Sequence, residues 1–126
     1  MDETAIQSTE WDLLEVLWEL ERATAPQVAE ALAERRGWAY STVKTMLDRM
    51  LKKGLVHGRR VGHVWEYSAA VPRVDAQRSA WRRFVETAFG GAMAPALRFV
   101  ATDAKLTRKQ RDALLTLLRD EEDNHG

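Results

Sequence analysis

Short hydroxyl and basic side chains gather on one face of the segment 40–53, whose apolar residues recur at helical spacing. On a wheel of 100° per residue, this face lies opposite an apolar arc that starts at Val43 and ends at Leu51. Hydroxyls and a flexible ammonium can approach base edges in the major groove of DNA, and helix N-termini also favour phosphate. The side chains expected to read base edges are Ser41, Thr42, Lys44 and Thr45.

The charges of the chain cancel overall but are strongly separated along it. Residues 1–34 hold nine acids and one base, whereas residues 35–63 hold eight bases and one acid, Asp48. A basic block of this kind is typical of a surface that binds a polyanion, although it is also compatible with an ordinary solvated helix face. Asp48 lies four residues from both Lys44 and Lys52, so an intrahelical ion pair is expected to mask it.

A basic hairpin is predicted to follow this helix. The stretches Leu55–Arg60 and Val64–Ser68 have strand character, and a glycine-containing loop at 61–63 joins them. Trp65 and Tyr67 alternate on one strand face, where we expect them to pack on the core rather than stack on bases. The side chains expected to contact phosphates are Tyr40, Arg49, Lys53, Arg59, Arg60 and His63.

Two further helices precede the basic one. Thr9 with Asp12 predicts the start of a helix over about 9–21, and the capping box Thr24-Ala25-Pro26-Gln27 starts a second one that reaches about Arg36. The basic helix ends at Gly54, and Trp38 before it is expected to be a packing anchor. A short strand at Ala23-Thr24 is a candidate partner for the hairpin edge. The order of helix, helix, helix and hairpin is that of a winged helix-turn-helix.

The last third of the chain is predicted to be helical, over about 74–89, 93–102 and from Thr107 onward. The fold class is therefore mainly α with a small β-hairpin wing, with a DNA-binding domain at 1–72 and a helical dimerisation region at 73–126. A segment this small rarely holds a core alone, so we expect two copies to pack together through the apolar stripes of these helices. The alternative is that the stripes fold back on the first domain. The residues expected to form the dimer are Trp81, Phe84, Val85, Phe89, Leu97, Leu114, Leu117 and Leu118.

Catalytic, metal-binding and membrane functions have little support in the sequence. The chain has no cysteine, and its three histidines, His57, His63 and His125, are scattered without ligand spacing. The carboxylates of the first two helices are interpreted as solvated faces. No run of about 18 apolar residues or signal-peptide pattern is present. We therefore expect a cytoplasmic protein that is not an enzyme and needs no metal or cofactor.

Several strings of residues also resemble a known family. They are Glu10-Trp11, Trp38, Thr42-Val43-Lys44-Thr45-Met46-Leu47, Arg49-Met50, Lys52-Lys53-Gly54, Trp65-Glu66-Tyr67-Ser68, Gly90-Gly91, Phe99-Val100 and Leu106-Thr107. With them the chain resembles the penicillinase-repressor family of winged-helix transcriptional regulators (BlaI/MecI type) over nearly its whole length.

The resemblance implies a homodimeric repressor that binds palindromic operator DNA with TACA/TGTA half-sites. It also implies release by a sensor-linked protease, at a bond that aligns with Arg98-Phe99 where those family members have Asn-Phe. The cysteine cluster of the related copper-responsive repressors is absent. The alternative function is a winged-helix module that binds proteins and has no specific DNA binding.

Overall fold

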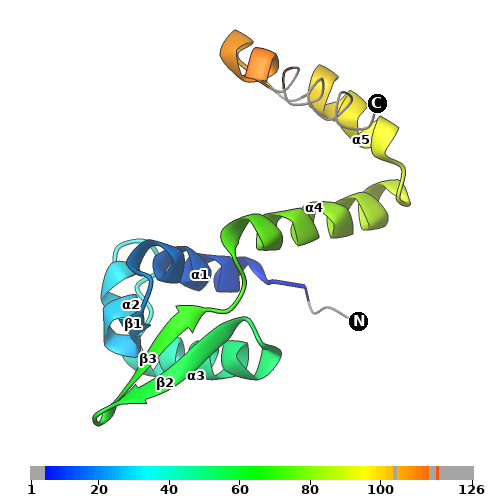
Figure 1. Ribbon diagram of the computed structural model, residues 1–126. Coiled ribbons are helices and arrows are strands. Elements are labelled where there is room, and N and C mark those ends of the chain that lie inside the picture. Colours follow the sequence, from blue (N-terminus) through cyan, green and yellow to red (C-terminus); the bar gives the residue numbers. More distant parts are fainter. Residues whose placement is uncertain (1–4, 104, 114–115, 117–126) are drawn as a thin grey trace. The chain divides into compact units, whose positions relative to one another are not determined.

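The computed structural model describes residues 5–103, 105–113 and 116 (Figure 1). The chain forms two compact units, Met1–Arg83 and Phe84–Gly126, and helix α4 (Arg73–Phe89) contributes residues to both. None of the helices described is long and apolar enough to cross a membrane.

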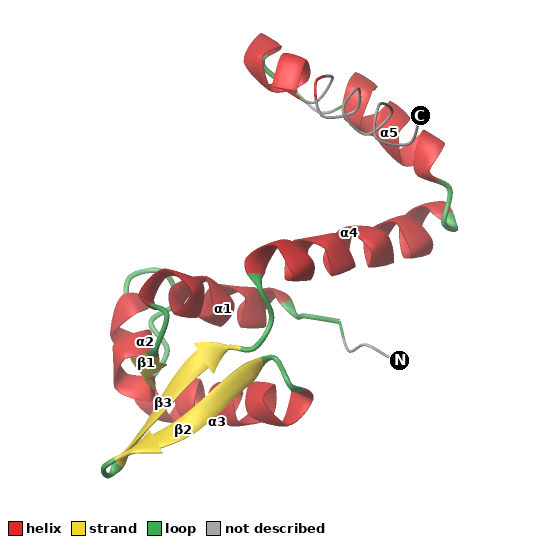
Figure 2. Cartoon of the chain, in the orientation of Figure 1, coloured by secondary structure: helices red, strands yellow, loops and turns green. Residues whose placement is uncertain are grey.

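The first unit contains three whole helices, a small antiparallel sheet and the first turns of α4 (Figure 2). The strand order is β1-β3-β2, so the short strand β1 pairs with the hairpin as predicted. This arrangement confirms the winged helix-turn-helix. The elements are α1 (Ser8–Leu20), β1 (Ala23–Thr24), α2 (Ala25–Ala31), α3 (Tyr40–Lys53), β2 (Val56–Val61) and β3 (Val64–Ala69).

The three helices and the sheet share one apolar core, which holds α3 in place. Burial of apolar surface contributes about 25 cal/mol per Å², so this core is the main source of stability for the unit. Trp38 is half-buried against it and lies under the guanidinium of Arg36, as expected for a packing anchor. The largest fully buried side chains are Leu13, Leu14, Leu17, Val28, Val43, Leu47, Met50, Val56 and Tyr67.

Helix α3 begins and ends at the predicted residues. Gly54 follows it with φ 81°, a left-handed conformation that costs glycine little, and its N–H bonds the carbonyls of Met50 and Leu51. The chain then turns directly into β2. Gly54 therefore sets the angle between α3 and the hairpin.

The ends of the first two helices differ from prediction. Gln7, not Thr9, precedes the first turn of α1, and its backbone N–H donates to the Glu10 carboxylate at 2.9 Å. The Thr24 capping box is confirmed, with bonds of 2.8 and 3.3 Å to Gln27. Helix α2 stops at Ala31 rather than near Arg36, because residues 32–36 form turns that carry Arg35 and Arg36 toward α1.

The first turns of α4 belong to the first unit, so this unit extends past residue 72. Arg73 bonds both oxygens of Glu15 on α1 at 3.0 and 3.2 Å, and Ala76 is buried. The indole N–H of Trp18 donates to the carbonyl of Val71 at 2.9 Å. These contacts fix the start of α4 on α1.

The second unit contains the end of α4, helix α5 (Met93–Thr102) and a helical stretch at 108–113. Thr107 and Gln110 form the predicted capping box, with bonds of 3.0 and 3.1 Å. The ring centroids of Phe84 and Phe89 lie 5.7 Å apart, and those of Phe89 and Phe99 lie 5.6 Å apart. An aromatic cluster thus joins α4 to α5.

Candidate nucleic-acid interface

The first turn of α3 presents small polar side chains to solvent. Ser41, Thr42 and Thr45 are exposed, and Tyr40 is half-exposed at the helix start. Ala39 precedes the helix and offers no side-chain cap, so the first backbone N–H groups lack that partner. This end of α3 therefore combines small hydroxyls with the positive end of a helix dipole.

Lys44 lies on the side of α3 that faces the hairpin. Its ammonium donates to Asp48 at 2.8 Å, which is the intrahelical pair predicted from the sequence, and it lies 5.9 Å from the centroid of the Tyr67 ring. The hydrogen bond to Asp48, and after it the one to Tyr67, raise the pKa of Lys44 above its ordinary value. Lys44 is therefore a fixed positive charge at the edge of the helix.

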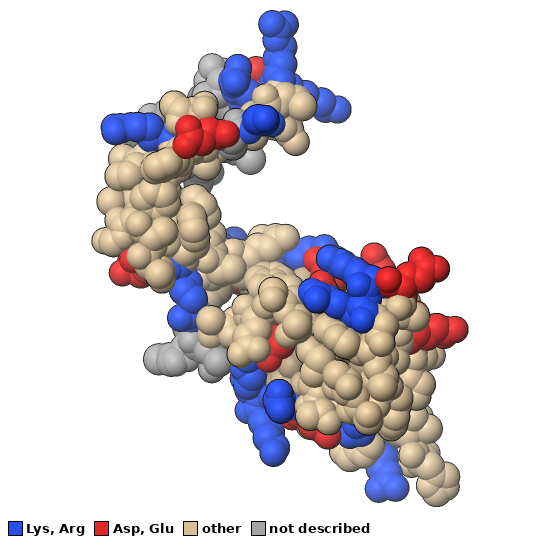
Figure 3. Space-filling view, turned by 180° about the vertical axis from the view of Figure 1, so that it is seen from behind, with Lys and Arg blue, Asp and Glu red and all other residues tan. Residues whose placement is uncertain are grey.

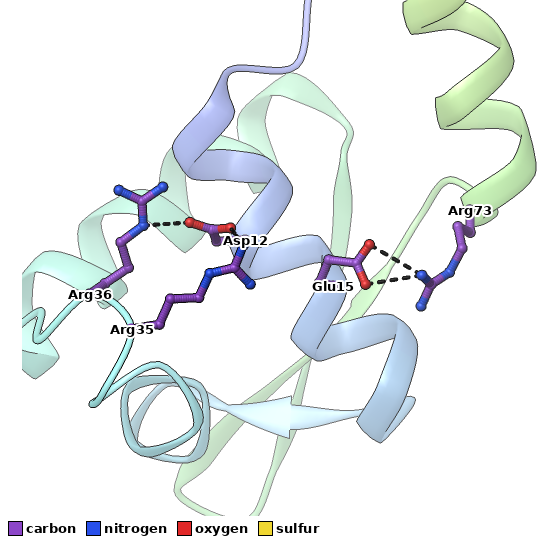
Figure 4. Close-up of polar contacts among 5 residues, drawn as sticks. All are labelled: Asp12, Glu15, Arg35, Arg36 and Arg73. Carbon is purple, nitrogen blue, oxygen red and sulfur yellow. Dashed lines mark hydrogen bonds and ion pairs between the residues drawn. The ribbon is translucent and has the colours of Figure 1, made fainter. Parts of the chain in front are cut away.

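A buried carboxylate binds two arginines just before α3 (Figure 4). Asp12 on α1 is buried, and it accepts hydrogen bonds or ion pairs from Arg36 and from Arg35, the latter at 3.2 Å. These arginines come from the turns between α2 and α3. The contact ties the entry of α3 to α1, and it corrects the interpretation of Asp12 as part of a solvated face.

A second buried carboxylate binds Lys53, one of the residues expected to contact phosphate. The Lys53 ammonium bonds both oxygens of Glu10, at 2.7 and 2.8 Å, and the side chains are 21% and 8% exposed. Glu10 is therefore not on a solvated face either. The ammonium of Lys53 therefore joins α3 to α1, at the edge of an open hollow.

Ion pairs of this kind neutralise many of the basic side chains of residues 35–63. On the face shown in Figure 3, Lys and Arg side chains form several separate groups, some of them beside Asp or Glu, and not one continuous field. Arg49, Lys52 and Arg60 are exposed and form no ion pair with a residue that the structure describes. Arg49 and Lys52 line an open hollow that Gln7, just before α1, and Thr9 of α1 also border.

The hairpin forms at the predicted place, but its turn is shorter than predicted, because Val61 belongs to β2 and pairs with Val64. Arg59 pairs with Glu66 across the strands, and Arg60 pairs with Trp65. The Arg59 guanidinium lies 3.4 Å from the Glu66 carboxylate, and both side chains reach solvent. His63 is exposed in the turn, and no three His, Asp or Glu side chains among the described residues are grouped to hold a metal ion.

The two aromatic residues of β3 have different environments. Tyr67 is 2% exposed and belongs to the core, as predicted. Trp65, expected to pack in the same way, is 43% exposed. The strand alternation was interpreted correctly, but β3 continues beyond the edge of the core, so its outer aromatic ring lies partly in solvent.

The residues expected to form a dimer are only partly available on the surface. Trp81, Phe84 and the nearby Met93 are exposed, Phe89 and Leu97 are half-buried, and Val85 is buried within a single chain. Leu114, Leu117 and Leu118 lie outside the described residues.

The Arg98-Phe99 bond lies inside α5. Phe99 is 55% exposed, and its carbonyl accepts a hydrogen bond from the backbone N–H of Asp103 at 2.8 Å. The carbonyl of Arg98 accepts a hydrogen bond from the Thr102 hydroxyl, also at 2.8 Å. The bond is thus held in helical conformation.

Three known proteins illustrate what this chain is similar to in sequence or in structure. The 16.5 kDa protein of the ptsI 3′ region of Latilactobacillus sakei is 30% identical over 64% of this chain, and the match spans 56% of that protein's length. The methicillin resistance regulatory protein MecI of Mammaliicoccus sciuri is 26% identical over 75% of this chain and 78% of its own. The solution structure of monomeric BlaI from Bacillus licheniformis, in complex with the blaP half-operator, is 26% identical, with a TM-score of 0.51, over 59% of this chain and 90% of that one.

The similarity to the BlaI structure supports the winged-helix architecture of the first unit. The family described as penicillinase repressor matches residues 6–120, which reach from the start of α1 beyond the end of α5. Since this match extends through both compact units, the chain belongs to the penicillinase repressor family.

Proposed function

We propose that the protein is a sequence-specific transcriptional repressor that binds palindromic operator DNA as a homodimer. The observation that carries this proposal is the exposed first turn of α3, with its small hydroxyls beside a fixed ammonium. The similar BlaI protein has been solved with a half-operator, which supports the same role for this surface.

Helix α3 is the element that enters the major groove in this proposal. Ser41, Thr42 and Thr45 carry no long side chain that would keep the helix away from base edges. Lys44 reads acceptor atoms such as those of guanine, and it exchanges Asp48 for them when DNA arrives. Base contacts of this kind give sequence preference.

Phosphate contacts on both sides of α3 position it. Arg49 and Lys52 face one strand from the hollow beside α1, and Arg59, Arg60 and His63 face the other from the hairpin. Arg59 is exposed, so it can leave Glu66 for a phosphate. Tyr40 lies at the helix start, where its hydroxyl can reach the backbone. Lys53 has no part in this set, because Glu10 holds its ammonium.

The second unit supplies the dimer contacts. Phe84 and Phe99 are more than half exposed although they belong to an aromatic cluster, and a second copy would remove this apolar surface from water. Twofold symmetry then places two copies of α3 about one helical turn of DNA apart. Occupancy of promoter DNA by this dimer would block transcription.

Release from DNA is the other part of the proposed cycle. Cleavage at Arg98-Phe99 by a sensor-linked protease requires local unwinding of α5, because proteases bind extended chain and this bond is helical. Limited proteolysis of the free and DNA-bound protein, with mass analysis of the fragments, tests whether this bond is accessible.

Fluorescence anisotropy on a TACA/TGTA palindrome and on a scrambled duplex tests the proposed function. We expect tighter binding to the palindrome, with a log–log salt slope of about −5 if about six phosphates are neutralised. Equal binding to both duplexes would contradict sequence-specific recognition. No binding to either would favour the alternative, a winged-helix protein-interaction module.

A further inference from the structure

The hairpin has two faces of different chemical character. Successive residues of a strand point to opposite sides, so the register of β2 and β3 assigns each residue to one face. We call the face that includes Tyr67 the inner face and the other the outer face. The inner face carries Gly58, Arg60, Trp65 and Tyr67, and the outer face carries Arg59, Val61, Val64 and Glu66.

The inner face lies against α3. A Cβ added at Gly58 would come within 3.5 Å of both Leu51 of α3 and the Trp65 ring, and within 3.6 Å of Tyr67. The Lys44 ammonium of α3 lies over the Tyr67 ring. The Trp65 ring therefore extends the surface formed by α3 along the hairpin, toward its turn. It lies two residues nearer the turn than Tyr67, whose ring is buried.

The charges of the two faces also differ. Arg60 lies directly opposite Trp65 and has no ion pair with a described residue, and this face of the hairpin bears no acid. On the outer face, the Glu66 carboxylate forms an ion pair with the Arg59 guanidinium. The inner face therefore presents the exposed Trp65 ring beside the Arg60 guanidinium, which has no ion pair with a described residue. These two groups suit the sugars and phosphates of a DNA strand.

We propose that the exposed Trp65 ring packs on a deoxyribose of the operator strand that flanks α3, while Arg60 contacts the adjoining phosphate. The proposal rests on the proposed function and adds an apolar contact to it. Deoxyribose offers C–H groups to an aromatic face, so contact removes apolar area on both partners from water. The occupant is duplex DNA, because Lys44, which reads base edges in the proposed function, lies over the Tyr67 ring of this same face.

The matched variants are Trp65→Ala and Val64→Ala, which change neighbouring residues of one strand with similar exposure, 43% and 47%, on opposite faces. On the TACA/TGTA duplex we expect Trp65→Ala to weaken binding about tenfold, by the loss of apolar burial, and Val64→Ala to leave it unchanged. The salt slope of Trp65→Ala stays at the unsubstituted value, because no phosphate contact is lost. Arg60→Ala lowers that slope by about one.

Hydroxyl-radical footprinting separates a sugar contact from a loss of structure, because the radical attacks deoxyribose. With Trp65→Ala we expect lost protection at the sugars flanking the half-site, and continued protection where α3 binds. Trp65→Phe keeps an aromatic ring, and we expect it to restore both affinity and protection. Thermal unfolding confirms that each variant is folded. If Trp65→Ala is not, Trp65→Gln, which keeps a longer side chain but has no aromatic ring, replaces it in the comparison with the same expected losses.

The outcomes distinguish this proposal from the proposed function. If the unsubstituted protein binds the palindrome and Trp65→Ala binds and protects it equally well, the sugar contact is wrong and the repressor function stands. Weaker self-association of Trp65→Ala in sedimentation, with unchanged DNA binding, would assign the ring to a second copy of the chain. If the unsubstituted protein binds no duplex, both proposals fail.

Discussion

Lys53, at the last turn of α3, donates to both carboxylate oxygens of Glu10, in the first turn of α1, at 2.8 and 2.7 Å. Glu10 accepts a further bond from the Gln7 backbone N–H, so one buried carboxylate caps α1 and fixes the end of α3. The pair joins residues 43 positions apart in the chain. The pair therefore fixes the position of α3 relative to α1.

The first prediction concerns the stability that this pair provides. Glu10→Gln removes the charge that Lys53 meets in a largely buried site, so the free energy of unfolding should fall by about 1–3 kcal/mol. Urea unfolding measures it. Glu15→Gln is the matched control, because it changes an exposed carboxylate on the same helix, paired with Arg73, and should cost less than about 1 kcal/mol. Equal losses would mean that the Glu10–Lys53 pair is no more than a surface contact.

The second prediction concerns Asp48, the acid on the side of α3 that we propose faces DNA. Asp48→Asn removes a charge that repels phosphates and releases Lys44 from its ion pair. Affinity for the palindrome and for the scrambled duplex should therefore rise together, by about threefold to tenfold. Asp75→Asn removes an exposed acid that is paired in the same manner with Arg78 on α4, and it should leave affinity unchanged. A loss of affinity in Asp48→Asn would show that the ion pair orients Lys44 for binding.

The third prediction addresses the role of Lys44 itself. Lys44→Ala should cost about 1–3 kcal/mol of binding to the palindrome and reduce the preference for it over the scrambled duplex. Anisotropy titrations on both duplexes measure this. Lys52→Ala, which removes an exposed lysine later in α3, should weaken binding to both duplexes equally. If Lys44→Ala does the same, Lys44 contacts only phosphate.

The local features of the fold were predictable because short sequence patterns determine them. Gly54 marks the end of α3, Thr24 and Gln27 mark the start of α2, and the alternation of β3 places Tyr67 in the core. Each depends on backbone preferences or on side chains a few residues apart. The exposure of Ser41, Thr42 and Thr45 on α3 follows from the same helical periodicity.

The remaining features depend on contacts between distant parts of the chain. Asp12 meets Arg36 across 24 positions, and no local pattern distinguishes this buried acid from a solvated one. The strong separation of charge along the sequence was the available signal, since acids of the first segment neutralise bases of the second. The exposure of Trp65 and the burial of Val85 depend on where the core ends, which periodicity does not reveal.

The fourth prediction concerns pH. The pKa of Lys44 is raised in the folded chain, so its contribution to stability is complete below the ordinary lysine pKa of about 10.4 and is lost only as pH rises through the higher folded value. The difference in free energy of unfolding between the unsubstituted protein and Lys44→Met should therefore stay constant from about pH 6 to about pH 9. Urea unfolding at about pH 7, 9 and 11 measures it, and the difference should shrink between the last two values. A difference that stays constant up to about pH 11 would show that the folded pKa of Lys44 is not raised.

The fifth prediction tests the dimer surface of the second unit. Phe84 is 52% exposed on α4, and a carboxylate there would have to be buried if two copies pack through this surface. Phe84→Asp should therefore sediment as a monomer at concentrations where the unsubstituted protein is a dimer. Val74→Asp places the same charge on a residue of α4 that is 56% exposed but lies in the first unit, and it should remain a dimer.

The same variant tests how dimerisation contributes to DNA binding. The Phe84→Asp monomer should bind a single half-site as tightly as the unsubstituted protein does. It should lose the added affinity of the full palindrome, because linked binding of two copies provides that affinity. A Phe84→Asp protein that still sediments as a dimer would place the interface elsewhere in the chain.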